Sequence, residues 1–211
     1  MKKTALILSN GVPPGMELMK RMWQEVNLKV CADGGANFAV SQGFIPDVVV
    51  GDMDSILLEV RQKLEIERIV EITEQNTNDS DKALRYCLNQ GVHEVHLLGA
   101  AGERSDQFLA NIELLYKYAS EMKITLWTEQ DRIELIEGTW QENMAPGTTL
   151  SLLPLFGPVE EITTSGLAFP LQNQKLEMGK EPSGISNKTI TPSVQISMGK
   201  GTLLLIIQSV Q

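Results

Sequence analysis

Asp47-Val48-Val49-Val50-Gly51-Asp52-Met53-Asp54-Ser55 joins a run of β-branched residues to two aspartates that stand one residue apart. Such a run predicts a buried strand that leads into a polar loop. Because side chains alternate in direction along an extended chain, Asp52 and Asp54 should point to the same side. Paired carboxylates suit Mg2+, which prefers oxygen ligands and often shares them with substrate phosphates. The stretch therefore predicts a magnesium-nucleotide site, with a solvated acidic turn as the alternative.

The composition is that of an acidic globular protein. The chain has 211 residues, 42% hydrophobic and 21% charged, which is enough for one large domain or two small ones. Its formal net charge is -9. A nucleic-acid partner would normally require a basic stripe to neutralise phosphates, and the sequence has no such run of Lys or Arg. We therefore expect no nucleic-acid partner.

The first residues combine a basic start with a short apolar run. Met1-Lys2-Lys3 precedes Thr4–Leu8, but the run stops at Ser9-Asn10-Gly11, short of a signal-peptide core. We interpret it as a first strand, and no stretch resembles a transmembrane span, so no membrane partner is expected. Cys31 and Cys87 fit no metal spacing and are expected to be reduced. The cytoplasm is the expected location.

The first half of the chain repeats one pattern, in which an apolar strand meets a loop of Gly, Asn, Asp or Ser and a helical stretch follows. Strands are predicted at residues 4–8, 29–32, 48–50, 68–72 and 94–98, and helices at 17–26, 56–64, 80–89 and 107–120. Alternating strands and helices predict βαβ crossovers and a mainly parallel sheet. Ligands of such sheets bind beyond the carboxyl ends of the strands, where these polar loops must lie.

The second half has a different pattern. From about Lys123, short strand candidates alternate with turns such as Ala145-Pro146-Gly147, and no helical period follows residue 121. The strand candidates are 124–127, 132–136, 148–155, 159–163, 175–177, 189–190, 194–197 and 202–207. Closely spaced strands without helices predict a small antiparallel sandwich. The boundary falls near residues 128–140, so we expect an α/β domain at 1–130 and an all-β sandwich at 131–211.

Several loop residues suit phosphate chemistry, each with a simpler alternative. Asp33-Gly34-Gly35 could bring backbone N–H groups close to a phosphate, because glycine lacks a Cβ. Asp79 is either a third acidic ligand or a helix N-cap. Lys82 could reach phosphate or be a solvated surface residue. Arg104 could bind phosphate oxygens, or simply pair with Asp106.

The ordered set of loop motifs resembles the thiamine pyrophosphokinase family, and the resemblance covers nearly the whole chain. It rests on blocks that lie in the same order as in that family: Ser9-Asn10-Gly11, Asp33-Gly34-Gly35-Ala36-Asn37, Gly51-Asp52-Met53-Asp54-Ser55, Gln75 through Lys82, Gly99 through Asn111, Ser165-Gly166-Leu167 and Ser186-Asn187.

Membership would imply an α/β domain that binds nucleotide and carries catalysis. It would also imply a β-sandwich for thiamine binding and dimerisation, and a homodimer whose active sites are shared between subunits. The implied reaction transfers the pyrophosphoryl group of ATP to the hydroxyl of thiamine and releases AMP, with Mg2+ as cofactor and ATP as co-substrate.

The resemblance also implies roles for single residues. The metal ligands would be Asp52, Asp54 and Asp79, and these act in catalysis together with Arg104 and Asp106. The thiamine contacts would be Gln75, Phe169, Ser186 and Asn187. The nucleotide contacts would be Asn10, Gly11, Asp33, Gly34, Gly35, Asn37, Lys82 and Arg104.

Two positions depart from the family pattern. Asn76 stands where relatives usually have Asp, which would leave three metal-binding aspartates rather than four. Glu103 precedes Arg104 where relatives tend to have Gly, and its charge would repel phosphate unless it points outward.

Two other functions remain open. An Asp-x-Asp strand end also suits a metal-dependent nucleotide-sugar transferase. The missing carboxylate at Asn76 would also be compatible with a non-catalytic thiamine or nucleotide sensor.

Overall fold

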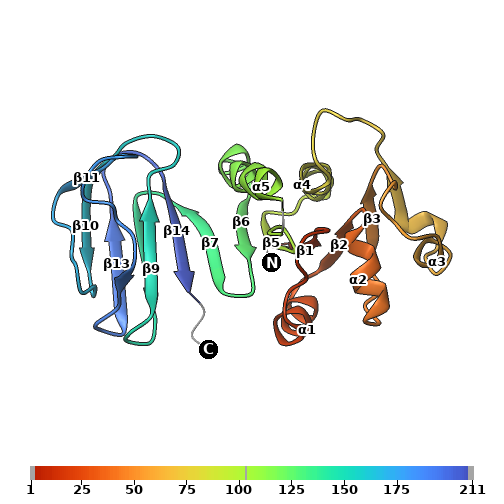
Figure 1. The fold of residues 1–211 in the computed structure, drawn as a ribbon, viewed down its shortest axis with the longest axis horizontal. Coiled ribbons are helices and arrows are strands. Elements are labelled where there is room, and N and C mark those ends of the chain that lie inside the picture. Colours follow the sequence, from red (N-terminus) through yellow and green to blue (C-terminus); the bar gives the residue numbers. More distant parts are fainter. Residues whose placement is uncertain (1–2, 103, 209–211) are drawn as a thin grey trace. The chain divides into compact units, whose positions relative to one another are not determined.

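Figure 1 shows the computed structural model, which describes residues 3–102 and 104–208. The chain divides into two compact units between Glu129 and Gln130. Each unit has its own architecture, and the two are described in turn as unit 1 and unit 2.

Unit 1 contains a parallel six-stranded sheet in the order β4-β3-β2-β1-β5-β6. Its strands are β1 (Thr4–Leu8), β2 (Leu28–Ala32), β3 (Val48–Gly51), β4 (Ile69–Glu71), β5 (Glu94–Leu98) and β6 (Lys123–Trp127). The chain builds the sheet outward from β1 to β4 and then returns to the other side of β1 with β5. The order of the strands therefore reverses at β1, which is where open α/β sheets bind ligands.

The helices of unit 1 cover both faces of this sheet (Figure 1). They are α1 (Met16–Glu25), α2 (Gly35–Ser41), α3 (Leu58–Arg61), α4 (Asp79–Asn89) and α5 (Ser105–Lys117), with a 3-10 turn at Ile66–Arg68. In Figure 1, α1 and α2 lie on one side of the strands and α4 and α5 on the other. Met19 and Met22 of α1 pack with Ala36 and Ala39 of α2 against alternate residues of the strands.

The helix expected at residues 56–64 is shorter than predicted. Its helical turn covers only Leu58–Arg61, because Leu57 is extended, with ψ of 139°. The Leu57 N–H donates to Asn37 Oδ1 at 2.9 Å, so a side chain from α2 fixes where the helix begins. The apolar spacing alone could not show this tertiary contact.

Unit 2 is built from two antiparallel four-stranded sheets with the orders β12-β9-β14-β7 and β11-β10-β13-β8. The strands are β7 (Asp131–Ile136), β8 (Thr139–Asn143), β9 (Thr149–Leu153), β10 (Val159–Ser165), β11 (Gln174–Leu176), β12 (Asn187–Lys188), β13 (Ser193–Ser197) and β14 (Leu203–Gln208). Inward residues of both sheets share one buried core, including Leu150, Leu205, Ile162 and Ile196. Unit 2 is therefore the predicted all-β sandwich.

Two strands of unit 2 differ from expectation. β8 was missed because Trp140, which packs against the core, is its single apolar residue, so this edge strand shows no apolar alternation. The strand expected at residues 189–190 is instead β12, at Asn187–Lys188.

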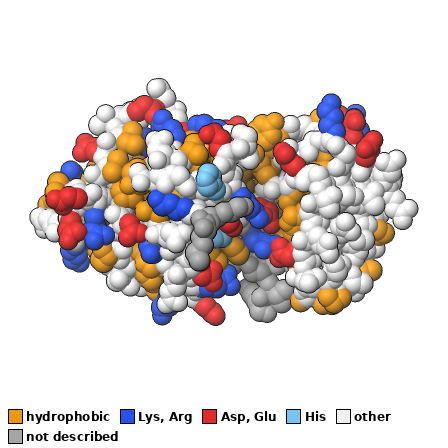
Figure 2. Space-filling model, turned by 180° about the vertical axis from the view of Figure 1, so that it is seen from behind, with side chains coloured by type: hydrophobic (Ala, Val, Ile, Leu, Met, Phe, Trp, Pro, Cys, Tyr) orange, Lys and Arg blue, Asp and Glu red, His pale blue; other side chains and the backbone are white. Residues whose placement is uncertain are grey.

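Two observations concern the surface. No helix among the described residues is both long enough and apolar enough to cross a membrane. Acidic and basic side chains are interspersed on the face shown in Figure 2, with apolar side chains between them.

Candidate active site

A cavity of about 940 Å³ opens at the carboxyl ends of the unit 1 strands. Ser9 follows β1 and Gly99 follows β5, so the cavity lies where the strand order reverses. Its size is typical of a small-molecule site. Of the residues expected to act, the lining includes Asn10, Gly11, Asp52, Asp54, Gln75, Asp79, Lys82 and Arg104.

Three carboxylates form an acidic cluster beside this cavity. Asp33, Asp52 and Asp54 each offer one oxygen, and these oxygens lie within 4.8 Å of one another. The sheet brings them together, because the Asp33 N–H donates to Val50 O at 2.9 Å and aligns the ends of β2 and β3. Gly51 permits this approach, since a Cβ there would lie 2.7 Å from the Asp33 Cβ.

Asp33 has the chemistry of a cation ligand. It is buried, and its Oδ2 accepts from the Ser55 N–H at 3.0 Å. Its buried Oδ1 has no hydrogen-bond partner among the described residues. Burial raises the pKa of Asp33, and the charges of Asp79 and Asp54 act in the same direction. A bound cation would satisfy the orphaned oxygen and offset this repulsion, so the cluster fits Mg2+.

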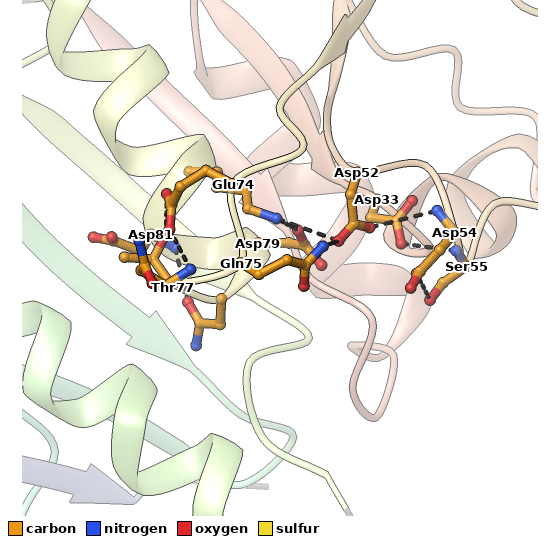
Figure 3. A network of polar contacts seen from close by, with 12 residues as sticks. Asp33, Asp52, Asp54, Ser55, Glu74, Gln75, Thr77, Asp79 and Asp81 are labelled. Carbon is orange, nitrogen blue, oxygen red and sulfur yellow. Dashed lines mark hydrogen bonds and ion pairs between the residues drawn. The ribbon is translucent and has the colours of Figure 1, made fainter.

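Asp52 is held by a side chain from another loop. Gln75 Nε2 donates to Asp52 Oδ2 at 2.8 Å. Figure 3 shows the Gln75 side chain pointing toward Asp52. This hydrogen bond is the main cause of the lowered pKa of Asp52. The carboxylate is therefore kept ionised, the form in which it can bind a cation.

Lys82 is one of the most buried side chains of the chain, at 1% exposure. Its Nζ lies 2.9 Å from Asp79 Oδ1 and 3.5 Å from Asp52 Oδ2. Burial acts to lower the pKa of Lys82, but the hydrogen bond and charge of Asp79 outweigh it and raise the pKa. Lys82 is therefore a charged internal partner of two carboxylates, and the solvated-surface alternative is wrong.

Asp79 is the first residue of α4, and its alternative interpretation as an N-cap is also wrong. Asn78 caps the helix instead, because its Oδ1 accepts from the Asp81 N–H at 2.9 Å. Asp79 is outside the three-carboxylate group of the described residues and pairs with Lys82. It still lines the cavity beside Asp52.

Glycines in the loops pack so closely against neighbouring atoms that a Cβ would not fit. A Cβ on Gly11 would lie 2.3 Å from Ala101 O, and one on Gly35 would lie 2.1 Å from Leu8 O. A Cβ on Gly34 would lie 2.3 Å from Nδ2 of Asn10, which lines the cavity. These glycines therefore allow close contact between neighbouring loops and strands.

Asn37 is occupied by the loop that follows the acidic cluster. Its Nδ2 donates to Ser55 O at 2.9 Å and its Oδ1 accepts from the Leu57 N–H. Asp33, Gly34, Gly35 and Asn37 all lie outside the cavity lining formed by the described residues.

Arg104 and Asp106 form a surface ion pair, which is one of the two arrangements predicted for Arg104 from the sequence. Arg104 Nη2 lies 2.6 Å from Asp106 Oδ2, and both side chains are more than half exposed. Pairing with Arg104 lowers the pKa of Asp106. Arg104 lines the cavity, so it also remains available to an anion there. Glu103 lies outside the described residues.

The three residues expected to contact thiamine from unit 2 lie close together. Phe169 is 71% exposed, an unusual exposure for an aromatic side chain. Asn187 holds it in place, because the Asn187 side chain accepts from the Phe169 N–H at 3.0 Å and donates to Phe169 O at 2.7 Å. Ser186 has a left-handed φ of 55°, and its N–H donates to Ser151 Oγ. The oxygen and the nitrogen of the Asn187 amide thus both bind the Phe169 backbone.

Two features were not recognised from the sequence. Asp33 was expected only among the nucleotide contacts, and the structure places its carboxylate with those of Asp52 and Asp54. The available signal for this was the position of Asp33 at the end of β2, the strand beside β3. The second feature is the set of contacts around Arg85 described below, which had no sequence signal.

Comparisons with known proteins match the same family over both units. Residues 19–126 match the family model "Thiamin pyrophosphokinase, catalytic domain", and residues 139–203 match "Thiamin pyrophosphokinase, vitamin B1 binding domain". The chain is 30% identical to the thiamine pyrophosphokinase of Bacillus subtilis over 210 residues, covering 97% of this chain and 98% of that protein. It is 30% identical to thiamine pyrophosphokinase 1 of Arabidopsis thaliana, covering 82% of this chain and 74% of that protein.

The fold agrees with solved structures over the same length. The crystal structure of Bacillus subtilis thiamine pyrophosphokinase superposes with a TM-score of 0.88 at 28% identity, covering 99% of this chain and all of that one. The Geobacillus thermodenitrificans enzyme gives a TM-score of 0.86 at 28% identity, covering 99% of this chain and 98% of that one. Because the catalytic and vitamin-binding models match in order and a curated relative aligns along almost its whole length, the chain belongs to the thiamin pyrophosphokinase family.

Proposed function

We propose that this chain transfers the pyrophosphoryl group of ATP to the hydroxyl of thiamine, giving thiamine diphosphate and AMP. The observation that carries the proposal is the acidic cluster of Asp33, Asp52 and Asp54 beside a cavity large enough for a nucleotide. The names of the relatives supply the substrates, and the cluster supplies chemistry that a phosphoryl-transfer enzyme needs.

In the proposed site Asp52 and Asp54 hold Mg2+, with Asp33 as a third ligand and Asp79 completing the acidic set. When bound, Mg2+ supplies charge neutralisation at the phosphates of ATP. Asp33 is added to the ligands expected from the sequence because its orphaned buried oxygen lies next to the other two carboxylates. Lys82 balances the charge of Asp52 and Asp79 rather than binding phosphate, since both of its close contacts are carboxylates.

The proposed reaction is a direct displacement at phosphorus. The hydroxyl oxygen of thiamine attacks the β-phosphorus of ATP, while the bond from that phosphorus to the bridging oxygen of AMP breaks. A cluster carboxylate accepts the hydroxyl proton. Arg104 leaves its exposed pairing with Asp106 and stabilises the charge that develops on the phosphate oxygens, because an exposed ion pair holds it only weakly.

We propose that Gln75 and Phe169 contact thiamine, with Ser186 beside Phe169 and Asn187 fixing its backbone. The hydrogen bonds between Asn187 and Phe169 support this division of roles. Asn10 and Gly11 are proposed to line the nucleotide side of the cavity together with Arg104. By family resemblance, the working unit is proposed to be a homodimer in the cytoplasm, and the free, buried Cys31 and Cys87 are compatible with a reducing compartment.

One assay tests the proposal. The purified protein is incubated with Mg2+, ATP and thiamine, and AMP and thiamine diphosphate are measured together, with chelator-treated protein as the control. Equal amounts of both products are expected, and none with chelator. Release of diphosphate from a nucleotide sugar without reaction on thiamine would overturn the proposal in favour of a sugar transferase. Tight thiamine binding without turnover would overturn it in favour of a sensor.

A further inference from the structure

We propose that Arg85 is a positioning residue, which holds the segment between β4 and α4 so that Gln75 reaches Asp52. This segment, residues 72–78, is called the Gln75 loop below. The inference rests on the proposed function for its kinetic part, and on the contacts of the loop for its structural part.

Arg85 binds the Gln75 loop at two points on either side of Gln75. Its Nη2 donates to Glu74 Oε2 and to Thr77 Oγ1, each at 2.8 Å. Thr77 Oγ1 in turn donates to Glu74 Oε2 at 3.1 Å, and the Asn76 N–H donates to Glu74 Oε1. One guanidinium therefore joins two residues of the loop. In Figure 3, Glu74 and Thr77 lie on one side of Gln75, whose side chain points toward Asp52.

Charge assists the contact between Arg85 and Glu74. The hydrogen bond from Arg85 lowers the pKa of Glu74, and the same bond raises the pKa of Arg85. Both groups therefore stay ionised across the physiological range, and hydrogen bonds between ionised groups are stronger than neutral ones.

Arg85 also lies beside a buried carboxylate, with which it forms an ion pair but no hydrogen bond. Asp81 is 1% exposed and lies one helical turn before Arg85 on α4, with Asp81 Oδ2 3.8 Å from Arg85 Nε. Asp81 Oδ1 accepts from Lys117 Nζ at 2.7 Å and from the Tyr118 hydroxyl at 2.6 Å. The Gln75 loop is thus connected through Arg85 and Asp81 to the end of α5.

The far end of the loop is fixed independently. Asn78 caps α4 and donates to Asn111 Oδ1 of α5 at 3.0 Å, and Asn111 donates to Ala100 O at 2.8 Å. Residues 74 and 77 are held by Arg85 and residue 78 by α5, so the backbone of Gln75 has little freedom. Its side chain can then hold Asp52 at 2.8 Å without first ordering the loop.

Arg85 and Glu74 do not themselves line the cavity of the described residues. Arg85 therefore acts through Gln75 and Asp52 rather than on substrate. This distinguishes it from Lys82, which lies on the same helix but contacts Asp52 directly.

The structural arm of the test is amide hydrogen exchange without substrates, measured on peptides that cover residues 72–79. Arg85→Met removes the donors and keeps an aliphatic stem. We expect exchange in the loop to rise roughly tenfold, as hydrogen bonds to a charged donor are lost from a locally opening segment. The matched control is Arg61→Met, because Arg61 is 43% exposed against 42% for Arg85 and also pairs with a glutamate. Unchanged loop exchange in Arg85→Met, or an equal rise in Arg61→Met, would overturn the proposal.

The kinetic arm separates positioning from general stability. Misplacing Gln75 should lower kcat roughly 10- to 100-fold in Arg85→Met, with the KM for ATP unchanged. Arg85→Lys keeps the charge and one contact and should recover part of the loss, while Arg61→Met should keep normal kcat. A kcat equal to that of the unmodified protein, or a loss with no recovery by lysine, would contradict the proposal. If the unmodified protein makes no thiamine diphosphate, the proposed function fails, and the exchange arm still decides whether Arg85 orders the loop.

Discussion

Asp33 carries a charge that the fold buries beside two other carboxylates, at a cost to the metal-free protein. Its pKa is raised above the ordinary value of 3.8, mainly by burial. For such a group, the contribution to stability is fully present below the unfolded pKa and is lost as pH rises through the folded pKa. Near neutral pH, ionised Asp33 therefore lowers the stability of the fold, which is compatible with its proposed role as a metal ligand.

We predict that Asp33→Asn raises the thermal midpoint in chelator at pH 7 and abolishes most pyrophosphoryl transfer. The asparagine avoids the buried charge and tolerates the left-handed φ of 40° at this position. The pH-dependent part of the stabilisation should vanish in acid, where Asp33 is protonated, and grow as pH rises. Thermal denaturation between about pH 3 and 7 measures this, with the exposed Glu113→Gln as control. If the stability difference between Asp33→Asn and the unmodified protein did not change with pH, the assignment of a raised pKa to Asp33 would be wrong.

Asp54 is exposed, in contrast to Asp33, and its removal should affect chemistry alone. We predict that Asp54→Asn lowers the rate of AMP formation at saturating Mg2+ by at least roughly 100-fold, because a proposed carboxylate ligand of Mg2+ is lost. The free energy of unfolding should change by less than about 0.5 kcal/mol, as at other exposed positions. The two quantities are measured on the same preparation by product assay and urea titration. Near-normal AMP release would disprove the metal assignment of Asp54.

The start of α2 depends on a glycine for packing as well as for any role in binding. Gly35 is the first residue of that helix, and a Cβ there would lie 2.1 Å from the backbone oxygen of Leu8 at the end of β1. We predict that Gly35→Ala lowers the free energy of unfolding by about 2–3 kcal/mol, because backbone must move to admit the methyl group. Gly15→Ala is the matched control, with no atom within 4 Å of its Cβ, and should change it by less than about 0.5 kcal/mol. Equal effects of the two substitutions in urea titrations would show that contact with β1 is unimportant.

The elements of unit 1 could be predicted from the sequence wherever the pattern that defines them is local. The run Val48–Val50 forms most of β3, and the spacing of Leu18, Met22 and Val26 indicates a helix that the structure places at Met16–Glu25. Prediction failed where a tertiary contact decides, as at Leu57, or where an edge strand has a single apolar residue, as in β8. Periodicity reports burial, and these two segments are defined by hydrogen bonds instead.

The sequence predicted which loops form the candidate site, but not how the side chains of these loops are arranged. Motif order identified the residues around Asp52 and Gln75, whereas the pairing of β2 with β3 decided that Asp33 joins Asp52 and Asp54. The burial of Lys82 is likewise a result of packing, since a lone lysine on a helix gives no sign of it. Arg85 was overlooked because its partners become neighbours only through the path of the Gln75 loop.

At the level of the whole molecule, the carboxylates of the proposed metal site and the exposed aromatic residue belong to different units. Asp54 is in unit 1 and Phe169 is in unit 2. Family resemblance leads us to propose a homodimer with sites shared between subunits, which makes a prediction about mixed subunits. Asp54→Asn and Phe169→Ala should each be inactive, and neither should unfold the protein, because both side chains are exposed.

We predict that activity returns when the two inactive variants are mixed, unfolded together and refolded. Random reassociation places the defects in different chains in about half of the dimers, and one site of each such dimer is free of both, so about a quarter of the normal activity should return. Each variant refolded alone controls for the treatment, and sedimentation velocity establishes the dimer in every sample. If the carboxylates and Phe169 of one site came from the same chain, every site would keep one defect. The mixture would then stay as inactive as its components, and the proposal of shared sites would be wrong.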